Sequence, residues 1–463
     1  MADRDTLQPD QPAADEPKTV PHSKPHTNGA GGKDGRGAGD GSPEPDTLKR
    51  TRVALLGSAE LNRELVIALQ RLGAEVIAVG GHGDAPLHEV ADRTVVADLT
   101  DRDELTATIR RLHPKFVVSA AGAVAPDALA ATAGAGHAEL VPNIRSARLA
   151  ADPEAMRRVA ADQLGLPMAP FWFVGSVDEL RATAGHVGFP MAVKPAVASF
   201  GEGQSVMLRL DDVGPAWQRA MAAAGPDSPA RVLAETLVEV EHEVTLLTVS
   251  SSGPAGPTLD FCSPIGHRIL GTANGQLIAE SWQPHPLSPA ALDAAKSIAG
   301  RVVRALGGRG MFGIELLVNG DEVYFSGLSL RPHDIALLTS RTQRLSSIEL
   351  QARAILGLPI DAIMISPGAA RLVYSARQPA DPAPATDART GPIAEARPAT
   401  DAVVAGALHV PESDVLIFGP FDAMAADRGH PRRLSAALVT GPDVPTARER
   451  AERVSVALGR LWA

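Results

Sequence analysis

A short apolar strand that ends in a lysine and runs into a glycine-rich loop constrains this chain most. The strand is residues 188–195, GFPMAVKP, and the loop is residues 199–204, SFGEGQ. Such a loop lets backbone N–H groups approach phosphate oxygens, while Lys194 meets them as a point charge. The pattern predicts a nucleoside triphosphate site. The alternative is an ordinary surface lysine at a strand end.

Lys194 also stands out against the other cations of the chain. After residue 50 the sequence contains only Lys115, Lys194 and Lys296, because arginine supplies nearly all of the remaining positive charge. Arginine presents a wide planar fork, whereas lysine is a compact charge on a flexible stem. A lysine kept in this background indicates chemistry for which arginine is unsuited.

Composition narrows the class of protein. The chain has 463 residues, 44% of them hydrophobic and 21% charged, which is enough for two or three domains with full cores. Its single cysteine, Cys262, excludes a disulfide framework. The polar N-terminus does not resemble a secretory signal, and the net charge of −10 disfavours nucleic-acid and membrane partners. We therefore expect a cytoplasmic protein.

The chain divides by composition and periodicity. Residues 1–50 contain almost no large apolar side chain and are predicted to be a disordered tail. Strand and helix patterns alternate over 51–160, which predicts a parallel βαβ domain. Two mixed lobes follow over 161–368. The last part, 369–463, is expected to be a small β-rich lobe, with a strand at 403–408 and a Pro/Ala-rich loop at 377–400.

The turn after the first strand does not fit a dinucleotide-binding fingerprint. Only Gly57 of the three glycines is present, and Ala59 and Asn62 occupy the other two positions. The sequence therefore argues against NAD. The helix N-terminus at this turn remains able to receive a phosphate or another anionic group.

Several longer runs resemble one family. They are GSAELNRELVIALQRLGAEVIAV (57–79), VKPAVASFGEGQS (193–205), EVTLLTVS (243–250), FCSPIGHR (261–268), ESWQP (280–284), FGIELLVNGDEVYFS (312–326) and RPHD (331–334). In order and spacing they resemble the ATP-grasp superfamily and, within it, the formate-dependent glycinamide ribonucleotide formyltransferases of purine synthesis. The resemblance implies an α/β (α+β) ATP-grasp fold with its ATP-grasp domain at 161–368.

The same resemblance implies substrates and site residues. Formate and glycinamide ribonucleotide would be joined with ATP and Mg²⁺, in a homodimer. Substrate contacts fall on Glu60, Leu61, Asp334, Arg432 and Arg433, and the magnesium ligand is Glu315. ATP contacts fall on Lys194, Ser199, Phe200, Gly201, Glu202, Gly203, Gln204, Glu235, Thr236, Leu237, Val238 and Glu243.

The chain departs from the family pattern within the expected site. Glu202 stands where the family has a lysine, and Gly327 stands where it has a second magnesium glutamate. Ala120 and Gly122 stand where the family has two glutamates, and Pro153 stands where it has an ATP-binding arginine. The family's substrate-binding lysine is missing near Pro420. Arg157 or Arg158 could take the place of the arginine lost at Pro153. Three functions stay open: a working formyltransferase, an inactive paralogue that binds nucleotide or a purine intermediate, and another ATP-grasp ligase.

Overall fold

Three β-sheets carry the fold of this chain. The computed structural model describes residues 50–57, 61–81, 86–119, 124–134, 136, 138–196, 203–224, 230–253, 256–271, 276–330, 334–375, 400–418 and 433–462. The predicted tail, apart from Arg50, and the predicted loop at 377–400, apart from Thr400, lie outside these residues. Among the described residues, no helix is both long and apolar enough to span a lipid bilayer.

The first sheet is the predicted parallel one. Its five strands run in the order β3-β2-β1-β4-β5, all parallel to their neighbours. The strands are β1 (Arg52–Leu56), β2 (Glu75–Gly80), β3 (Arg93–Val96), β4 (Phe116–Ser119) and β5 (Glu139–Val141). The helices are α1 (Asn62–Arg71), α2 (Arg102–Leu112), α3 (Pro126–Gly134), α4 (Ile144–Ala151) and α5 (Pro153–Arg158), with single turns at Pro86–Glu89 and Val159–Gln163.

The second sheet carries Lys194. It has four antiparallel strands in the order β6-β9-β7-β8. They are β6 (Phe171–Val174), β7 (Met191–Pro195), β8 (Ser205–Met207) and β9 (Val232–Thr236), and the helices of this lobe are α6 (Val177–Val187) and α7 (Val213–Ala224), with a turn at Leu210–Asp212. Lys194 sits near the end of β7, just before the loop, as the sequence predicts.

The third sheet is antiparallel and has nine strands. Eight follow the order β15-β14-β10-β12-β13-β16-β18-β17, and β11 pairs with β10. They are β10 (His242–Gly253), β11 (Gly256–Phe261), β12 (Ile265–Gly271), β13 (Leu277–Gln283), β14 (Gly310–Asn319), β15 (Glu322–Ser329), β16 (Gly368–Tyr374), β17 (Ser413–Ile417) and β18 (Arg433–Thr440). The C-terminal strands β16, β17 and β18 thus extend this same sheet through the β13–β16 pairing.

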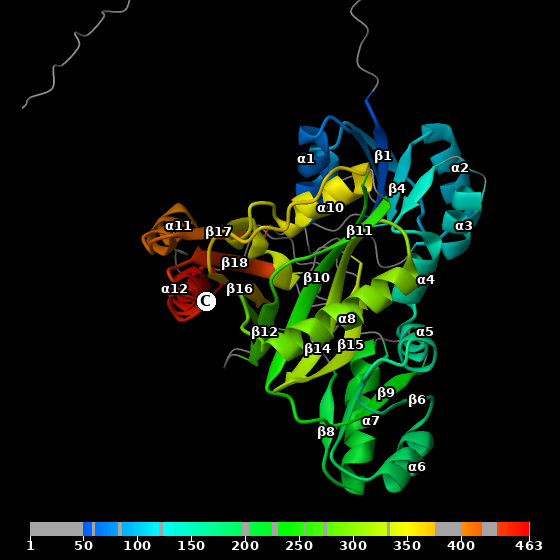
Figure 1. The fold of residues 1–463 in the computed structure, drawn as a ribbon, viewed down its shortest axis with the longest axis vertical. Coiled ribbons are helices and arrows are strands. Elements are labelled where there is room, and N and C mark those ends of the chain that lie inside the picture. The colour runs from blue at the N-terminus through cyan, green and yellow to red at the C-terminus, as the bar shows by residue number, and fades with distance from the viewer. Residues whose placement is uncertain are drawn as a thin grey trace, which may run out of the picture. The chain divides into compact units, whose positions relative to one another are not determined.

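The helices of this part are α8 (Pro289–Leu306), α9 (Thr339–Thr342), α10 (Ser347–Leu356), α11 (Thr400–Leu408) and α12 (Val444–Gly459), with a turn at Asp334–Ala336. The predicted strand at 403–408 is wrong, because these residues belong to α11. Val403 and Ala407, one helical turn apart, are both buried, and α11 packs on α12 (Figure 1). A short apolar run rich in alanine carries no periodicity that separates helix from strand.

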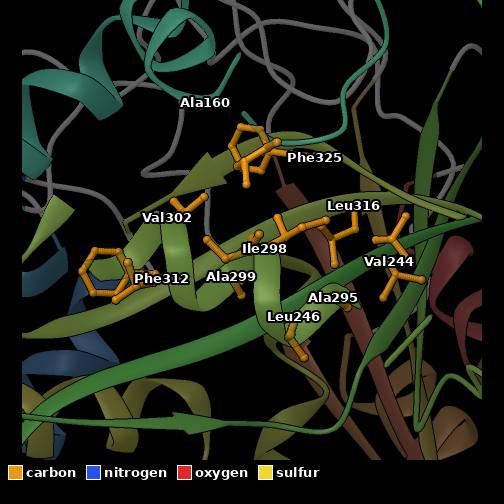
Figure 2. Close-up of a cluster of buried hydrophobic side chains, with 14 of the residues drawn as sticks. Ala160, Val244, Leu246, Ala295, Ile298, Ala299, Val302, Phe312, Leu316 and Phe325 are labelled. Atoms are coloured by element: carbon orange, nitrogen blue, oxygen red, sulfur yellow. The ribbon is translucent and has the colours of Figure 1, made fainter. Parts of the chain in front are cut away.

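The nine-stranded sheet, which we call the large sheet, has two distinct faces. Helix α8, capped by Ser288, packs its apolar side on β10 and β14 (Figure 2). Val244 and Leu246 point to this side, so Glu243 and Thr245 point to the other, because side chains alternate along a strand. Helix α12 packs on the same side as α8, against Ala369 and Ala437. We call the side with α8 and α12 the helix face, and the side with Glu243 the site face.

Candidate functional site

Lys194 forms an ion pair inside the four-stranded sheet, which we call the small sheet. Its Nζ lies 2.5 Å from Oε2 of Glu235, which stands on the neighbouring strand β9. The other carboxylate oxygen of Glu235 lies 2.5 Å from a guanidinium nitrogen of Arg157. Glu235 is buried, whereas the side chain of Lys194 is 28% exposed. Two cations therefore share one buried carboxylate, and Lys194 is the one with access to solvent.

Arg157 links this pair to the large sheet. Its side chain is only 8% exposed, and Nη2 donates a hydrogen bond of 3.0 Å to the carbonyl oxygen of Ser326 on β15. Ser326 directly precedes Gly327, where the resemblance leads us to expect a second magnesium glutamate. Arg158 instead pairs with Glu154 at 2.7 Å near the surface. Of the two arginines that could serve in place of the one expected at Pro153, Arg157 is the one held beside the predicted site.

Glu243 and Glu315 stand on adjacent strands of the site face. Thr245, two residues after Glu243, is the register partner of Glu315 on β10. On β15, the neighbouring strand at the opposite edge of β14, the register partner of Glu315 is Gly327. Partial desolvation and the nearby charge of Glu315 raise the pKa of Glu243, although its side chain is 53% exposed, and Lys194 opposes this shift. Lys194 and Glu315 therefore both act on Glu243, although the ion pair of Lys194 is with Glu235.

The metal-binding capacity of this face rests on Glu315. A Cβ added at Gly327 would lie 2.5 Å from Oε2 of Glu315, so the Glu315 carboxylate occupies the space that a side chain at position 327 would need. Within the described ranges no three His, Cys, Asp or Glu residues form a metal-binding group. Magnesium is commonly held by one or two carboxylates together with phosphate oxygens and water. Glu315 fits that need as a single protein ligand.

A second polar cluster joins distant parts of the chain. The carboxylate of Asp334 is 3% exposed and accepts from Arg433, at 2.9 Å from Nε and 2.8 Å from Nη2. The hydroxyl of Tyr374 donates to the same carboxylate at 2.6 Å. Burial and this carboxylate raise the pKa of Tyr374 well above its ordinary value. Asp334 thus fixes the position of Arg433, whose side chain is 26% exposed.

The resemblance implies that residues 235–238 contact the adenine of ATP, and these residues begin in β9 and continue past its end. The backbone N–H of Thr236 donates to Pro170, and that of Leu237 donates to Pro190. An adenine ring at this segment would therefore rely on other groups, such as those around Val238. Leu237 is 45% exposed, which leaves an apolar side chain available for a ring to pack against.

Gly203 is explained by packing. It has φ of +66°, and a Cβ there would lie 2.5 Å from the Cβ of Ala223 on α7. Gln204 beside it is exposed.

Leu61 is buried among core residues of the large sheet, including Leu247. Any substrate contact at Leu61 would therefore use its backbone.

Some predicted site residues lie outside the described part of the chain. They are Glu60, Ser199, Phe200, Gly201, Glu202 and Arg432, together with the departures Ala120, Gly122 and Pro420. Sequence reasoning missed the role of Tyr374, although its rarity was available as a clue, because the chain has only two tyrosines. His267, which lies 3.2 Å from the hydroxyl of Thr245 and 3.7 Å from Glu243, is a further neighbour of the site.

Comparison with known proteins places this geometry in a family. The model for the ATP-grasp domain matches residues 159–348. The formate-dependent phosphoribosylglycinamide formyltransferase of Paraburkholderia xenovorans is 44% identical over 417 residues, which cover 89% of this chain and 96% of that protein. The protein of the same name from Burkholderia pseudomallei is 45% identical over the same coverage.

Solved structures agree. The structure of glycinamide-RNase-transformylase T from Mycobacterium tuberculosis is 52% identical, covers 88% of this chain and 99% of its own, and superposes with a TM-score of 0.69. An N5-carboxyaminoimidazole synthase from Aspergillus clavatus, 19% identical over 89% of this chain and 99% of its own, superposes with a TM-score of 0.68 and shows the shared fold alone. The chain therefore belongs to the formate-dependent phosphoribosylglycinamide formyltransferase family and has the ATP-grasp fold.

Proposed function

We propose that this chain uses ATP to join formate to the amino group of glycinamide ribonucleotide. The observation that carries the proposal is the pair of carboxylates on the site face, Glu243 on β10 and Glu315 on the adjacent β14. Lys194 of the small sheet acts electrostatically on Glu243, and Asp334 holds Arg433 in place. In the proposed roles, Lys194 binds the triphosphate and Glu243 the ribose. Arg433, with Arg432, binds the substrate phosphate.

Formate is a poor acylating agent until its oxygen becomes a leaving group. A formate oxygen would attack the γ-phosphorus of ATP, release ADP and give formyl phosphate. The amine would then attack the formyl carbon and expel inorganic phosphate. Lys194 and Arg433 serve this sequence by orienting the two anionic substrates toward one another. Mg²⁺ held at Glu315 would neutralise phosphate oxygens.

The proposal is tested by ADP release from the purified full chain. With ATP, Mg²⁺, formate and glycinamide ribonucleotide, we expect ADP and the formylated ribonucleotide in equal amounts. Omission of formate, or its replacement by acetate, should stop both. ADP release only with another carboxylate and amine would indicate a different ATP-grasp ligase. No release with any such pair, alongside measurable nucleotide binding, would indicate an inactive paralogue, the reading that Gly327 opposite Glu315 favours.

A homodimer in the cytoplasm is the assembly and compartment that the family resemblance implies.

The two charge changes at the nucleotide site predict weakened Mg·ATP binding. Glu202→Lys with Gly327→Glu should tighten Mg·ATP at least about tenfold, or roughly 1.4 kcal/mol, in calorimetry with a non-hydrolysable analogue. A lysine at 202 removes repulsion of the triphosphate, and a glutamate at 327 adds a metal ligand. The added side chain displaces only the flexible end of Glu315. Glu202→Lys with Gly327→Gln is the matched control, and equal tightening by both doubles would exclude the metal-ligand explanation.

A further inference from the structure

Two of the runs that carry the family resemblance meet on the helix face. Arg268 ends the run FCSPIGHR on β12, and Glu280 begins ESWQP on β13. They are register partners, and Arg371 on β16 is the next partner of Glu280. Glu243 and Glu315 lie on the other face of this sheet. Arg268 and Glu280 therefore belong to a cluster that the proposed function does not use.

Glu280 is fully buried and fully engaged. Its Oε2 accepts from Arg268 and from Arg448 of α12, each at 2.7 Å. Its Oε1 accepts from Nε and Nη2 of Arg371, at 3.0 and 2.9 Å. Arg448 and Arg371 hold the pKa of Glu280 below its usual range despite burial, so the carboxylate is charged at neutral pH. A carboxylate accepts about four hydrogen bonds, so Glu280 is saturated.

Three guanidinium groups thus surround one buried carboxylate. Two further carboxylates, Glu449 and Glu452, line the cavity beside this cluster, and both residues are exposed. Glu452 lies 3.3 Å from Nη2 of Arg371, with a side chain that is 57% exposed. Exposed ion pairs of this kind contribute little, about 0–1 kcal/mol. Glu452 therefore neutralises the cluster weakly and can be displaced into solvent.

The cluster borders a cavity of about 310 Å³. The first turn of α12 also lines it, through Val444 and Pro445, and adds the partial positive charge of a helix N-terminus. Arg448 is held in place by the ring of Trp282, 4.2 Å from its guanidinium carbon. Its Nε is buried and has no hydrogen-bond partner among the described residues. A buried donor without a partner costs free energy, so an acceptor that reaches this nitrogen would be favourable.

We propose that this cavity is an oxyanion site that takes a phosphate group between Arg268, Arg371 and Arg448. The tetrahedral oxygens accept from guanidinium N–H groups that Glu280 cannot satisfy, and the ligand displaces Glu452 from Arg371. Planar guanidinium forks match phosphate geometry closely. The ligand is inorganic phosphate or a phosphate monoester, since both present the same group.

The test is calorimetry of the full chain with inorganic phosphate at constant ionic strength. Because the proposed catalytic site also binds phosphate groups, the titration is performed on Lys194→Met as well. We expect a binding event that survives Lys194→Met, weakens at least tenfold in Arg448→Met, and is unchanged in Arg453→Met, an exposed arginine on the same helix. Ribose 5-phosphate in a second titration separates the two sources: tighter binding than phosphate identifies a monoester.

Glu452→Gln provides a gain of affinity that a folding defect cannot imitate. It removes the competing carboxylate, so phosphate should bind at least threefold more tightly. Failure to detect an event that depends on Arg448, or weaker binding in Glu452→Gln, would overturn the proposal and leave the cluster as a structural clamp for α12. Neither result depends on formyl transfer, so the outcome is independent of the proposed function.

Discussion

Replacing Lys194 with methionine is expected to weaken Mg·ATP binding at least about 100-fold, or roughly 2.7 kcal/mol. The lysine is the partly exposed cation of the Glu235 pair, and the triphosphate would draw it from that carboxylate. Loss of one preorganised charged contact costs about 3–4 kcal/mol in comparable sites. Calorimetry with a non-hydrolysable analogue measures the change without requiring turnover.

The fold should tolerate this substitution. Glu235 keeps Arg157 at 2.5 Å, so its buried charge stays paired when Lys194 is removed. Lys296→Met, the same change on α8, is the matched control and should leave affinity unchanged. Lys194→Arg should recover only part of the affinity, because the arginine fork differs from a compact ammonium. An affinity loss below threefold in Lys194→Met would remove Lys194 from the triphosphate site.

The sequence predicts local features of this site well. The parallel pairing of the first sheet follows from alternating strand and helix patterns, and Lys194 at the end of a strand follows from GFPMAVKP. These features depend on residues close in the chain. The family runs added the expectation that Glu315 binds metal, which remains a proposal.

Contacts between distant residues could not be read from the chain. Arg157 reaches Ser326 across 169 positions, and Asp334 meets Arg433 across 99. The register that opposes Glu315 to Gly327 includes a bulge beside Glu315, and no sequence pattern places such an irregularity. Strands near the C-terminus similarly joined the large sheet through β13–β16 pairing, which only the tertiary fold determines.

The second large effect concerns the buried carboxylate of Asp334. Arg433→Met is expected to lower the free energy of unfolding by about 3 kcal/mol, because it removes the bidentate partner of a buried charge. Tyr374 still donates one hydrogen bond, but a neutral hydroxyl does not compensate the charge. Denaturant unfolding measures this loss, and Arg301→Met, an exposed arginine on α8, is the control.

Asp334→Asn combined with Arg433→Met should recover at least half of that stability, since an uncharged amide no longer requires a cationic partner. The double variant then separates the two roles of the cluster. The reference is Asp334→Asn alone, which keeps Arg433. If Arg433 binds the substrate phosphate, the double variant should bind Mg·ATP as this reference does, while its affinity for glycinamide ribonucleotide falls at least about tenfold below the reference, or roughly 1.4 kcal/mol. Unchanged ribonucleotide affinity in this stable variant would assign Arg433 a structural role only, as the ion-pair partner of Asp334.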